Sequence, residues 1–431
     1  MAIYSIENKG GITHYTDTVE NVTLTISSSQ CKGLAQLAPM PVLEDKNAFL
    51  EAVKSPVAGL PLEILTKEMN AKSACVIVSD ATRNVPNYLV AEHVVDALVA
   101  GGVPMDKIFF FEALGVHRPA TEAEMRAAIG ENLWGRVSIE NHTPFDYDNL
   151  VYLGDTSQGT PIEVNKKAYE CDIHISIGKT EPHEFAGFSG GRKSVLPGIA
   201  SERCIITNHR PEMISQPDCV PGSLDNNPVH KDMLETAKKF GIHYNINFVM
   251  TGDGEPSAIF GGSLEEAHAA SVAYSRKYCD VNVGHPDVIV TTPGTPLNID
   301  LYQSMKPLIA LTDVLDENSV VAMYCECPEG INSEDMMKPF QVTDSVESML
   351  EYVTANYKIQ MDHALLLAKI IKKKAKVVIY SPNVAPADIE SMYFYSATSV
   401  EDMFEKACAL TGKENPSVLF YPQAQKTLPL K

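Results

Sequence analysis

The residues best able to do chemistry gather in one segment of 21 residues, Gly178 to Gly198, which reads GKTEPHEFAGFSGGRKSVLPG. Its five glycines and two prolines argue against a long regular helix or strand. Glycine allows backbone N–H groups to approach an anion closely, and Arg192 and Lys193 add positive charge. The composition resembles that of a phosphate-binding loop, although neither GxxxxGK[ST] nor GxGxxG occurs. A lysine in such a pocket is also a candidate for covalent attachment.

Histidines stand out at two other places in the chain. His117 follows Gly115 in the segment GVHRP, directly after an apolar run. Its imidazole has a pKa near neutrality and could act as a general base, or it could be a structural loop residue. His209 lies sixteen residues after Lys193 in TNHRP. Imidazole suits nickel, zinc or copper, so His209 is a candidate metal ligand.

Two further segments carry groups that bind small anions or sugars. Asp80 and Arg83 follow an apolar run in SDATRNVP. Asp80 could accept from ribose hydroxyls or cap a helix, and Arg83 offers a bidentate fork to a carboxylate or phosphate. Tyr302, Gln303 and Lys306 fall within one expected helical turn after PGTP. They could together hold a carboxylate, or form an exposed polar helix face.

Eight apolar runs must position these residues. They are nearly continuous rather than alternating, which is typical of strands buried on both faces of a parallel sheet. Helical patterns, such as those at 86–100, 121–129 and 264–277, lie between them, and this alternation predicts an α/β fold. Ligands of such sheets bind beyond the carboxyl ends of the strands, where the candidate residues lie. The expected strands are 73–79, 107–114, 171–178, 244–252, 286–292, 319–325, 375–381 and 417–422.

The change from a helix to a fresh strand near residues 278–286 predicts a domain boundary. We expect two α/β domains with mainly parallel, Rossmann-like sheets, and an active site in the cleft between them. The N-terminal domain would span 1–278 and hold the cofactor, and the C-terminal domain would span 284–416 and contribute substrate-binding residues. The short hydrophobic tail, 417–431, is expected to pack back on the N-terminal domain.

The composition excludes several classes of protein. The 431 residues carry a formal charge of −20 and are 45% hydrophobic, which is ordinary for a globular protein and argues against a broad nucleic-acid-binding surface. No apolar run reaches the roughly 18 residues of a membrane span, and no secretory signal is visible. Nine scattered cysteines, an odd number, fit reduced thiols and a cytoplasmic protein. Cys325 and Cys327 are better explained as strand-end residues than as half of a metal site.

The motifs together resemble those of the lactate racemase family, whose enzymes use a nickel-pincer nucleotide. The resemblance covers most of the chain and is strongest in the block GKTEPHEFAGFSGGRKSVLPGIA. SDATRNVP, GVHRP, NHRP and LYQSMKP occur around it in the order that the family has. The implied activity is that of an isomerase, a racemase or epimerase that inverts C2 of a 2-hydroxyacid by reversible hydride transfer to the cofactor.

The resemblance also implies roles for particular residues. Lys193 would form a thioamide link to the pyridinium-3-thioamide-5-thiocarboxylic acid mononucleotide, and His209 would ligate its nickel. Two sulfurs and a carbon of the cofactor would be the other nickel ligands. His117 and His183 would be the two acid–base histidines, one on each face of the substrate. The other implied positions are Asp80, Ala81, Thr82 and Arg83 for the cofactor, and Arg83, Tyr302, Gln303 and Lys306 for the substrate.

Several interpretations remain open from the sequence. The substrate could be lactate or a larger 2-hydroxyacid or sugar acid, and separate biosynthetic proteins would have to supply the cofactor. A non-enzymatic nucleotide- or nickel-binding protein of the same fold would keep Lys193 and His209 but would not need both His117 and His183. A nicotinamide-dependent dehydrogenase is disfavoured because its glycine fingerprint is missing.

Overall fold

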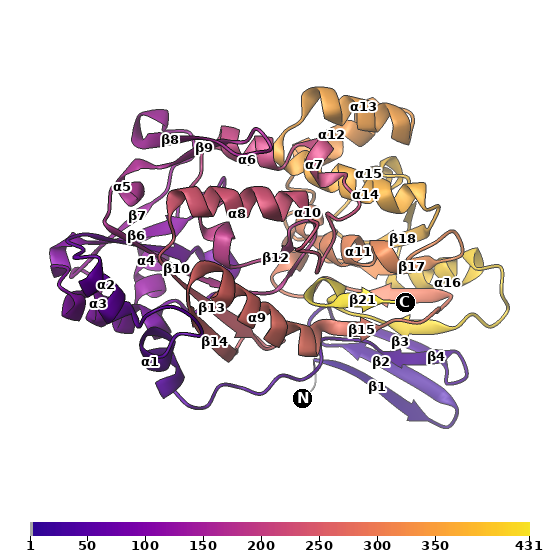
Figure 1. Cartoon of the computed structure of the whole chain (residues 1–431). Coiled ribbons are helices and arrows are strands. Elements are labelled where there is room, and N and C mark those ends of the chain that lie inside the picture. The colour runs from indigo at the N-terminus through magenta and orange to yellow at the C-terminus, as the bar shows by residue number, and fades with distance from the viewer. Residues whose placement is uncertain (1–2) are drawn as a thin grey trace. The chain divides into compact units, whose positions relative to one another are not determined.

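All eight apolar runs are strands in the computed structural model, which describes residues 3–431 (Figure 1). The chain divides into two compact units. Unit 1 comprises the chain up to Ala38, Arg210–Pro217 and Tyr278–Lys431, and unit 2 comprises Pro39–His209 and Asp218–Lys277. Each unit is built around one six-stranded, mainly parallel sheet, so the predicted α/β fold is confirmed.

The sheet of unit 2 has five parallel strands and one antiparallel edge strand. In spatial order these are β14 (Pro256–Gly262), β13 (Tyr244–Met250), β10 (Ile173–Lys179), β5 (Ala74–Ser79), β6 (Ile108–Ala113) and β7 (Ser138–Asn141). The antiparallel strand is β14, which pairs only with β13. The sequence predicted the five helix-linked positions less completely, because β7 and β14 are short or glycine-containing edge strands.

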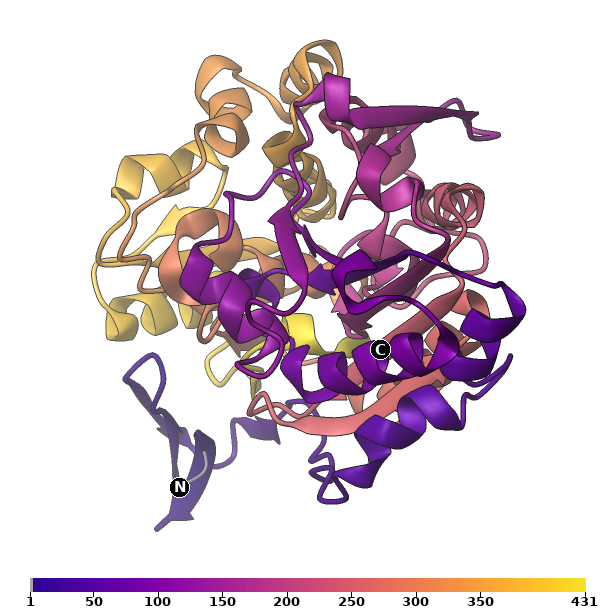
Figure 2. The ribbon, with the colours of Figure 1, turned by 90° about the vertical axis from the view of Figure 1, so that its left-hand side faces the viewer.

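The strand β5 shows why these runs are continuously apolar. Val76 and Val78 belong to one buried cluster, and Cys75 and Ile77 belong to another on the opposite face of the sheet. The first face is covered by α1 (Asn47–Lys54), α2 (Leu62–Glu68), α3 (Tyr88–Gly101) and α4 (Glu122–Ile129), three of which face the viewer in Figure 2. The second face is covered by elements that include α5 (Lys166–Tyr169), α8 (Pro228–Phe240), β9 (Pro161–Asn165) and the start of α9 (Leu264–Cys279).

Unit 2 also contains short elements that matter for the site. The predicted capping box is confirmed, since Thr121 accepts from the backbone of Glu124 and the Glu124 side chain accepts from the backbone of Thr121. The remaining elements of unit 2 are β8 (Leu150–Asp155), β11 (Pro182–His183), β12 (Gly187–Phe188), α6 (Glu202–Asn208) and the 3-10 turns η1 (Ala81–Arg83) and η4 (Gly191–Ser194).

The six strands of the unit 1 sheet are all parallel. Their order is β19 (Tyr395–Ser396), β18 (Lys376–Tyr380), β17 (Val320–Tyr324), β16 (Val288–Thr291), β20 (Val418–Phe420) and β4 (Cys31–Leu34). The helices of this unit are α7 (Pro211–Ile214), α10 (Leu301–Ser304), α11 (Lys306–Ala310), α12 (Glu334–Val342), α13 (Val346–Asn356), α14 (Asp362–Lys372), α15 (Pro386–Ser391) and α16 (Val400–Leu410).

Both ends of the chain belong to unit 1. An antiparallel sheet of β1 (Tyr4–Lys9), β2 (Ile12–Asp17) and β3 (Val22–Ser27) packs on the parallel sheet, where the Tyr15 ring stacks on Phe420 at 4.3 Å. Within the tail, β20 lies between β16 and β4, and β21 (Leu428–Leu430) pairs with β15 (Asp280–Asn282). This differs from the expected return of 417–431 to the N-terminal domain, because β20 completes the parallel sheet of unit 1. The domain limits 1–278 and 284–416 stay predictions.

Among residues 3–431, no helix combines the length and the apolar character needed to cross a membrane.

Candidate active site

The carboxyl end of β5 carries the first predicted site residue. Asp80 ends the strand and caps η1, where its Oδ1 accepts from the backbone N–H of Thr82 at 2.7 Å and from the Thr82 hydroxyl. The helix-cap explanation of Asp80 is therefore correct. The cap leaves the second carboxylate oxygen available, and Asp80 is almost fully buried.

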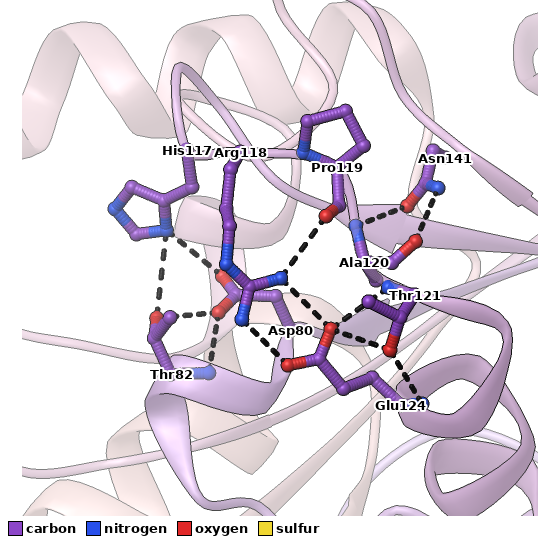
Figure 3. A network of polar contacts seen from close by, with 9 residues as sticks. All are labelled: Asp80, Thr82, His117, Arg118, Pro119, Ala120, Thr121, Glu124 and Asn141. Atoms are coloured by element: carbon purple, nitrogen blue, oxygen red, sulfur yellow. Dashed lines mark hydrogen bonds and ion pairs between the residues drawn. The ribbon is translucent and has the colours of Figure 1, made fainter.

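That second oxygen contacts His117, which follows the neighbouring strand β6 (Figure 3). The Nδ1 of His117 lies 3.1 Å from Oδ2 of Asp80, and its Nε2 lies 3.2 Å from Nη2 of Arg83. A carboxylate can only accept and a guanidinium can only donate, so the neutral ring donates from Nδ1 and accepts at Nε2. The arrangement holds His117 as the tautomer in which Nε2 can receive a proton.

Electrostatics keep Asp80 ionised. Burial raises the pKa of Asp80, but the hydrogen bond from His117 and the charge of Arg83 outweigh burial and hold it below its usual value. Two residues past His117, the chain is fixed by Arg118, which binds Glu124 through both guanidinium nitrogens at 2.8 and 2.6 Å (Figure 3). The His117 loop is thereby tied to the capping box of α4.

Glu112 lies behind this pair and was not predicted from sequence. It is fully buried on β6, and neither carboxylate oxygen has a hydrogen-bond partner within residues 3–431. Burial, followed by the negative charges of Asp80 and Glu124, raises its pKa to about 8. Glu112 is therefore neutral at pH 7, which leaves Asp80 as the ionised carboxylate beside His117.

Substituting Glu112 by glutamine is expected to stabilise the protein at alkaline pH. The folded chain holds the Glu112 proton more tightly than the unfolded chain, so stability falls as pH rises between the unfolded value, about 4.5, and the folded value, about 8. This loss is about 1 kcal/mol per pH unit in that interval and is absent from Glu112→Gln. Denaturant unfolding at pH 5 and pH 9 measures it. An equal difference between the two proteins at both pH values would contradict the assignment.

In the glycine-rich segment, Arg192 does not face a ligand. Its side chain is only 1% exposed and donates to the carbonyls of Ala186 at 2.7 Å and Gly190 at 3.3 Å, with the His268 ring at 3.1 Å. Burial, followed by the charge of Arg192, lowers the pKa of His268 to about 3, so His268 is a neutral partner. The anion-binding role suggested by the composition therefore does not extend to Arg192, which instead holds the turn that carries Lys193.

Phe185 connects the other predicted residues of this segment. Its ring meets His183 edge-on at 4.8 Å and His209 edge-on at 5.0 Å between centroids, and Lys193 Nζ lies 5.9 Å from its centre. Three residues selected from sequence for chemistry thus surround one buried phenyl ring. Phe185 itself was not selected, and its position two residues after His183 was the only available signal.

His209 is prepared to act as a neutral ligand. It ends α6, is buried, and its Nδ1 has no hydrogen-bond partner among the described residues. Burial, followed by the positive charge of Lys193, lowers its pKa to about 3. An unpartnered, deprotonated imidazole nitrogen beside a lysine fits a metal ligand next to a covalently attached group. No cluster of three or more His, Cys, Asp or Glu side chains in residues 3–431 could hold a metal ion without further ligands.

Replacing Phe185 by leucine tests its connecting role. The change conserves most of the apolar volume, so we expect a loss of unfolding free energy below about 1.5 kcal/mol. It removes the flat ring between His183, His209 and Lys193, so we expect reduced cofactor loading, measured as nickel per chain. Phe49→Leu, in the core beneath α1, is the matched control. Equal nickel content in both variants would show that Phe185 only fills space.

The remaining predicted residues, Tyr302, Gln303 and Lys306, belong to unit 1. Tyr302 and Gln303 lie on α10, which Asp300 caps by accepting from the backbone N–H of Gln303 at 2.7 Å, and Lys306 begins α11. All three are partly exposed, as a substrate contact requires. The predicted single helical turn is in fact two short helices joined at Met305, whose backbone is also helical.

Two further residues on α14 contact Tyr302. The His363 ring meets that of Tyr302 edge-on at 3.9 Å, and the Tyr302 hydroxyl lies 3.5 Å from Oδ1 of Asp362. Both residues are buried. The sequence gave no signal for them, since His363 lies in an ordinary amphipathic helical pattern. Cys325 and Cys327 are also buried, at and beyond the end of β17, as expected of strand-end residues.

Comparison with known families supports this selection of residues. The model of the lactate racemase N-terminal domain matches residues 18–220, and that of the lactate racemase C-terminal domain matches residues 281–424. Together the two matches span more than half of the chain.

Comparison with individual proteins gives the same family. A lactate racemase of Thermoanaerobacterium thermosaccharolyticum is 31% identical over 312 residues, which is 72% of each chain. A lactate racemase of Lactiplantibacillus plantarum is 30% identical over 376 residues, 86% of this chain and 88% of that protein. The structure of the T. thermosaccharolyticum lactate racemase apoprotein superposes with a TM-score of 0.88 at 26% identity, over 95% of this chain and 97% of that one. A Thermotoga maritima protein shares the fold, with a TM-score of 0.64 at 18% identity, over 86% of this chain and 97% of that one.

Proposed function

The chain belongs to the lactate racemase family, and from this premise we propose that it inverts the C2 stereocentre of a small 2-hydroxyacid. The observation that carries the proposal is the buried Asp80–His117 pair with Arg83 at the free ring nitrogen. This arrangement combines a base and a carboxylate-binding group at one strand end.

His117 would handle the proton of the substrate hydroxyl. Asp80 fixes the Nδ1–H tautomer and stabilises the imidazolium that forms when Nε2 accepts a proton. Arg83 occupies Nε2 in the structure, and we expect a substrate carboxylate to draw its guanidinium away. Binding of the substrate would thereby release the base that acts on it.

His183 would serve the opposite hand of the substrate. Its Nδ1 accepts from the backbone N–H groups of Phe185 at 3.5 Å and Ala186 at 3.4 Å, which places the proton of a neutral ring on Nε2. The Glu184 carboxylate lies 3.5 Å from the same Nδ1 and would stabilise the protonated ring. His183 thus has support for both protonation states, as an acid–base group requires. A racemase needs two such groups because each enantiomer presents its hydroxyl to a different side.

The residues present fit the nickel-pincer nucleotide of the family. Lys193 would hold it through a thioamide, His209 would offer its unpartnered Nδ1 to the nickel, and the turn from Asp80 to Arg83 would contact the remainder. When bound, the cofactor supplies the hydride acceptor for C2. The histidines of the chain therefore need to act only on oxygen-bound protons and not on the weakly acidic C2–H.

Arg83 and Lys306 would anchor the substrate carboxylate, with Tyr302 and Gln303 as further contacts. Cations suit this role because charge-assisted hydrogen bonds fix the orientation of a small acid. The buried contacts of Tyr302 with His363 and Asp362 would fix the ring that faces the rest of the substrate. The size of the C3 group that is accepted is the property by which lactate and a larger acid would differ.

The test is a panel of 2-hydroxyacids, from lactate to sugar acids, offered as single enantiomers to cofactor-loaded protein. Chiral chromatography should show conversion toward the opposite configuration at C2 from either starting enantiomer of at least one acid. Complete lack of inversion across the panel, by protein that contains nickel and the nucleotide, would reject the proposal in favour of a binding protein.

A further inference from the structure

The turn between β2 and β3 at the N-terminal end of unit 1 holds two buried carboxyl groups. Asp17 is fully buried and Glu20 nearly so. The Oδ1 of Asp17 accepts from the backbone N–H groups of Val19 at 2.9 Å and Glu20 at 3.1 Å. These bonds close the turn and fix the position of Glu20 relative to Asp17. Neither residue was selected from the sequence.

Both carboxyl groups bind the loop that follows β16. The Thr292 hydroxyl donates to Oδ2 of Asp17 at 2.8 Å, and the backbone N–H of Gly294 donates to Oε1 of Glu20 at 3.0 Å. The Asn298 side chain, further along this loop, also interacts with Glu20. Two segments that are far apart in sequence are thus joined by hydrogen bonds in the interior of one unit.

The loop leads directly to the residues proposed to bind substrate. It runs from Thr292 to Asp300, the N-cap of α10, and Asp300 is held in turn by the Asn332 side chain at 3.0 Å. Beyond it lie Tyr302, Gln303 and Lys306. The direction of α10 therefore depends on how the loop is fixed.

The opposite side of the loop is held by the segment after β20. The Gln425 side chain donates to the carbonyl of Pro293 at 2.9 Å, and the backbone N–H of Gln423 donates to the carbonyl of Thr292 at 2.8 Å. Gly294 has φ +65°, and a Cβ there would lie 2.1 Å from Nε2 of Gln423. Glu20 consequently approaches a stretch of backbone that has no side chain and little room to move.

We propose that Asp17 and Glu20 are positioning residues for substrate binding, which fix the loop 292–300 and through it the segment Tyr302–Lys306. This inference rests on the proposed function for the identity of the substrate. The two residues touch the loop and not the substrate-binding side chains, so their effect should appear mainly in substrate affinity.

Charge and hydrogen bonding at Glu20 can be separated experimentally. Burial, followed by the negative charge of Asp17, raises the pKa of Glu20 to about 7. An uncharged glutamine keeps an acceptor oxygen for Gly294 and avoids the cost of a buried charge. Glu20→Gln should therefore fold at least as well as the natural chain and retain its KM, whereas Glu20→Ala loses the acceptor.

The experiment compares Glu20→Ala, Glu20→Gln and Thr292→Val with Glu7→Ala, which removes an exposed carboxylate of β1. Loss of a charge-assisted hydrogen bond is expected to raise KM by about tenfold in Glu20→Ala, with kcat changed by less than about threefold. Thr292→Val should raise KM in the same direction, because it removes the donor to Asp17 without a change of shape. Glu20→Gln and Glu7→Ala should match the natural protein.

Hydrogen exchange of the cofactor-free chain provides a second readout that does not depend on activity. The backbone amides of residues 294–306 should exchange faster in Glu20→Ala and Thr292→Val than in Glu7→Ala. Unchanged exchange in both variants would overturn the proposal, even if the protein inverts no 2-hydroxyacid and the proposed function fails. Faster exchange with an unchanged KM would show that the contact stabilises the loop without positioning the substrate, and would also overturn it.

Discussion

Lys193→Ala should produce a chain that folds normally, carries no covalent nucleotide and inverts no 2-hydroxyacid. Lys193 is only partly buried and lies in a turn that Arg192 holds, so removing its side chain should leave the turn in place. The amine is the group through which the cofactor would be attached, and no other part of the proposed site can replace it. Intact mass of protein co-expressed with the cofactor-producing proteins measures the attachment.

Lys193→Arg is the matched control for this prediction. It keeps the positive charge beside Phe185 and His209 but cannot form the thioamide, so it should also lack the added mass. His209→Ala differs from both, because it should lose nickel while the lysine remains available. A nucleotide-sized mass increase in Lys193→Ala would show that attachment is at another residue or is not covalent.

His117→Ala is expected to retain nickel and to lose turnover by at least about a thousandfold, near the upper range for a general acid–base residue. Its contacts are with Asp80 and Arg83 only through the side chain, so the fold should persist. Inversion in either direction requires both histidines, and His183→Ala should show a comparable loss. Chiral assays on variants of matched nickel content measure the effect.

Asp80→Asn provides the conservative counterpart. The amide preserves the shape of the η1 cap but can donate to Nδ1, and it favours the tautomer with its proton on Nε2, which cannot act as a base. We expect turnover to fall with little change in unfolding free energy. Full activity in Asp80→Asn, or in His117→Ala, would contradict the acid–base role.

The fold could be predicted where burial on both faces leaves a continuous apolar run. This is why β5, with Val76 facing one core and Ile77 the other, was identified from sequence. The meander β1–β3 was missed although Val22, Leu24 and Ile26 alternate with polar residues, because only continuous runs were sought. The tail was placed with the wrong partner because a parallel strand order cannot be read from the chain order.

The candidate site was predictable only in part, for a related reason. Residues in glycine-rich or strand-end motifs, such as Asp80 and Lys193, are recognisable locally. Phe185, Glu112 and Glu20 acquire their importance from neighbours that tertiary packing brings to them. Their residue types are ordinary in isolation, so no spacing rule distinguishes them.

The most direct test of the central claim is inversion in deuterated water. Cofactor-loaded protein is given one enantiomer of an accepted 2-hydroxyacid, and the configuration and deuterium content at C2 are measured together. We expect the opposite enantiomer to appear with its original hydrogen at C2, since the two histidines act only on hydroxyl protons that exchange with solvent. Inversion accompanied by deuterium at C2 would mean that a base removes the C2 proton, and would contradict the account.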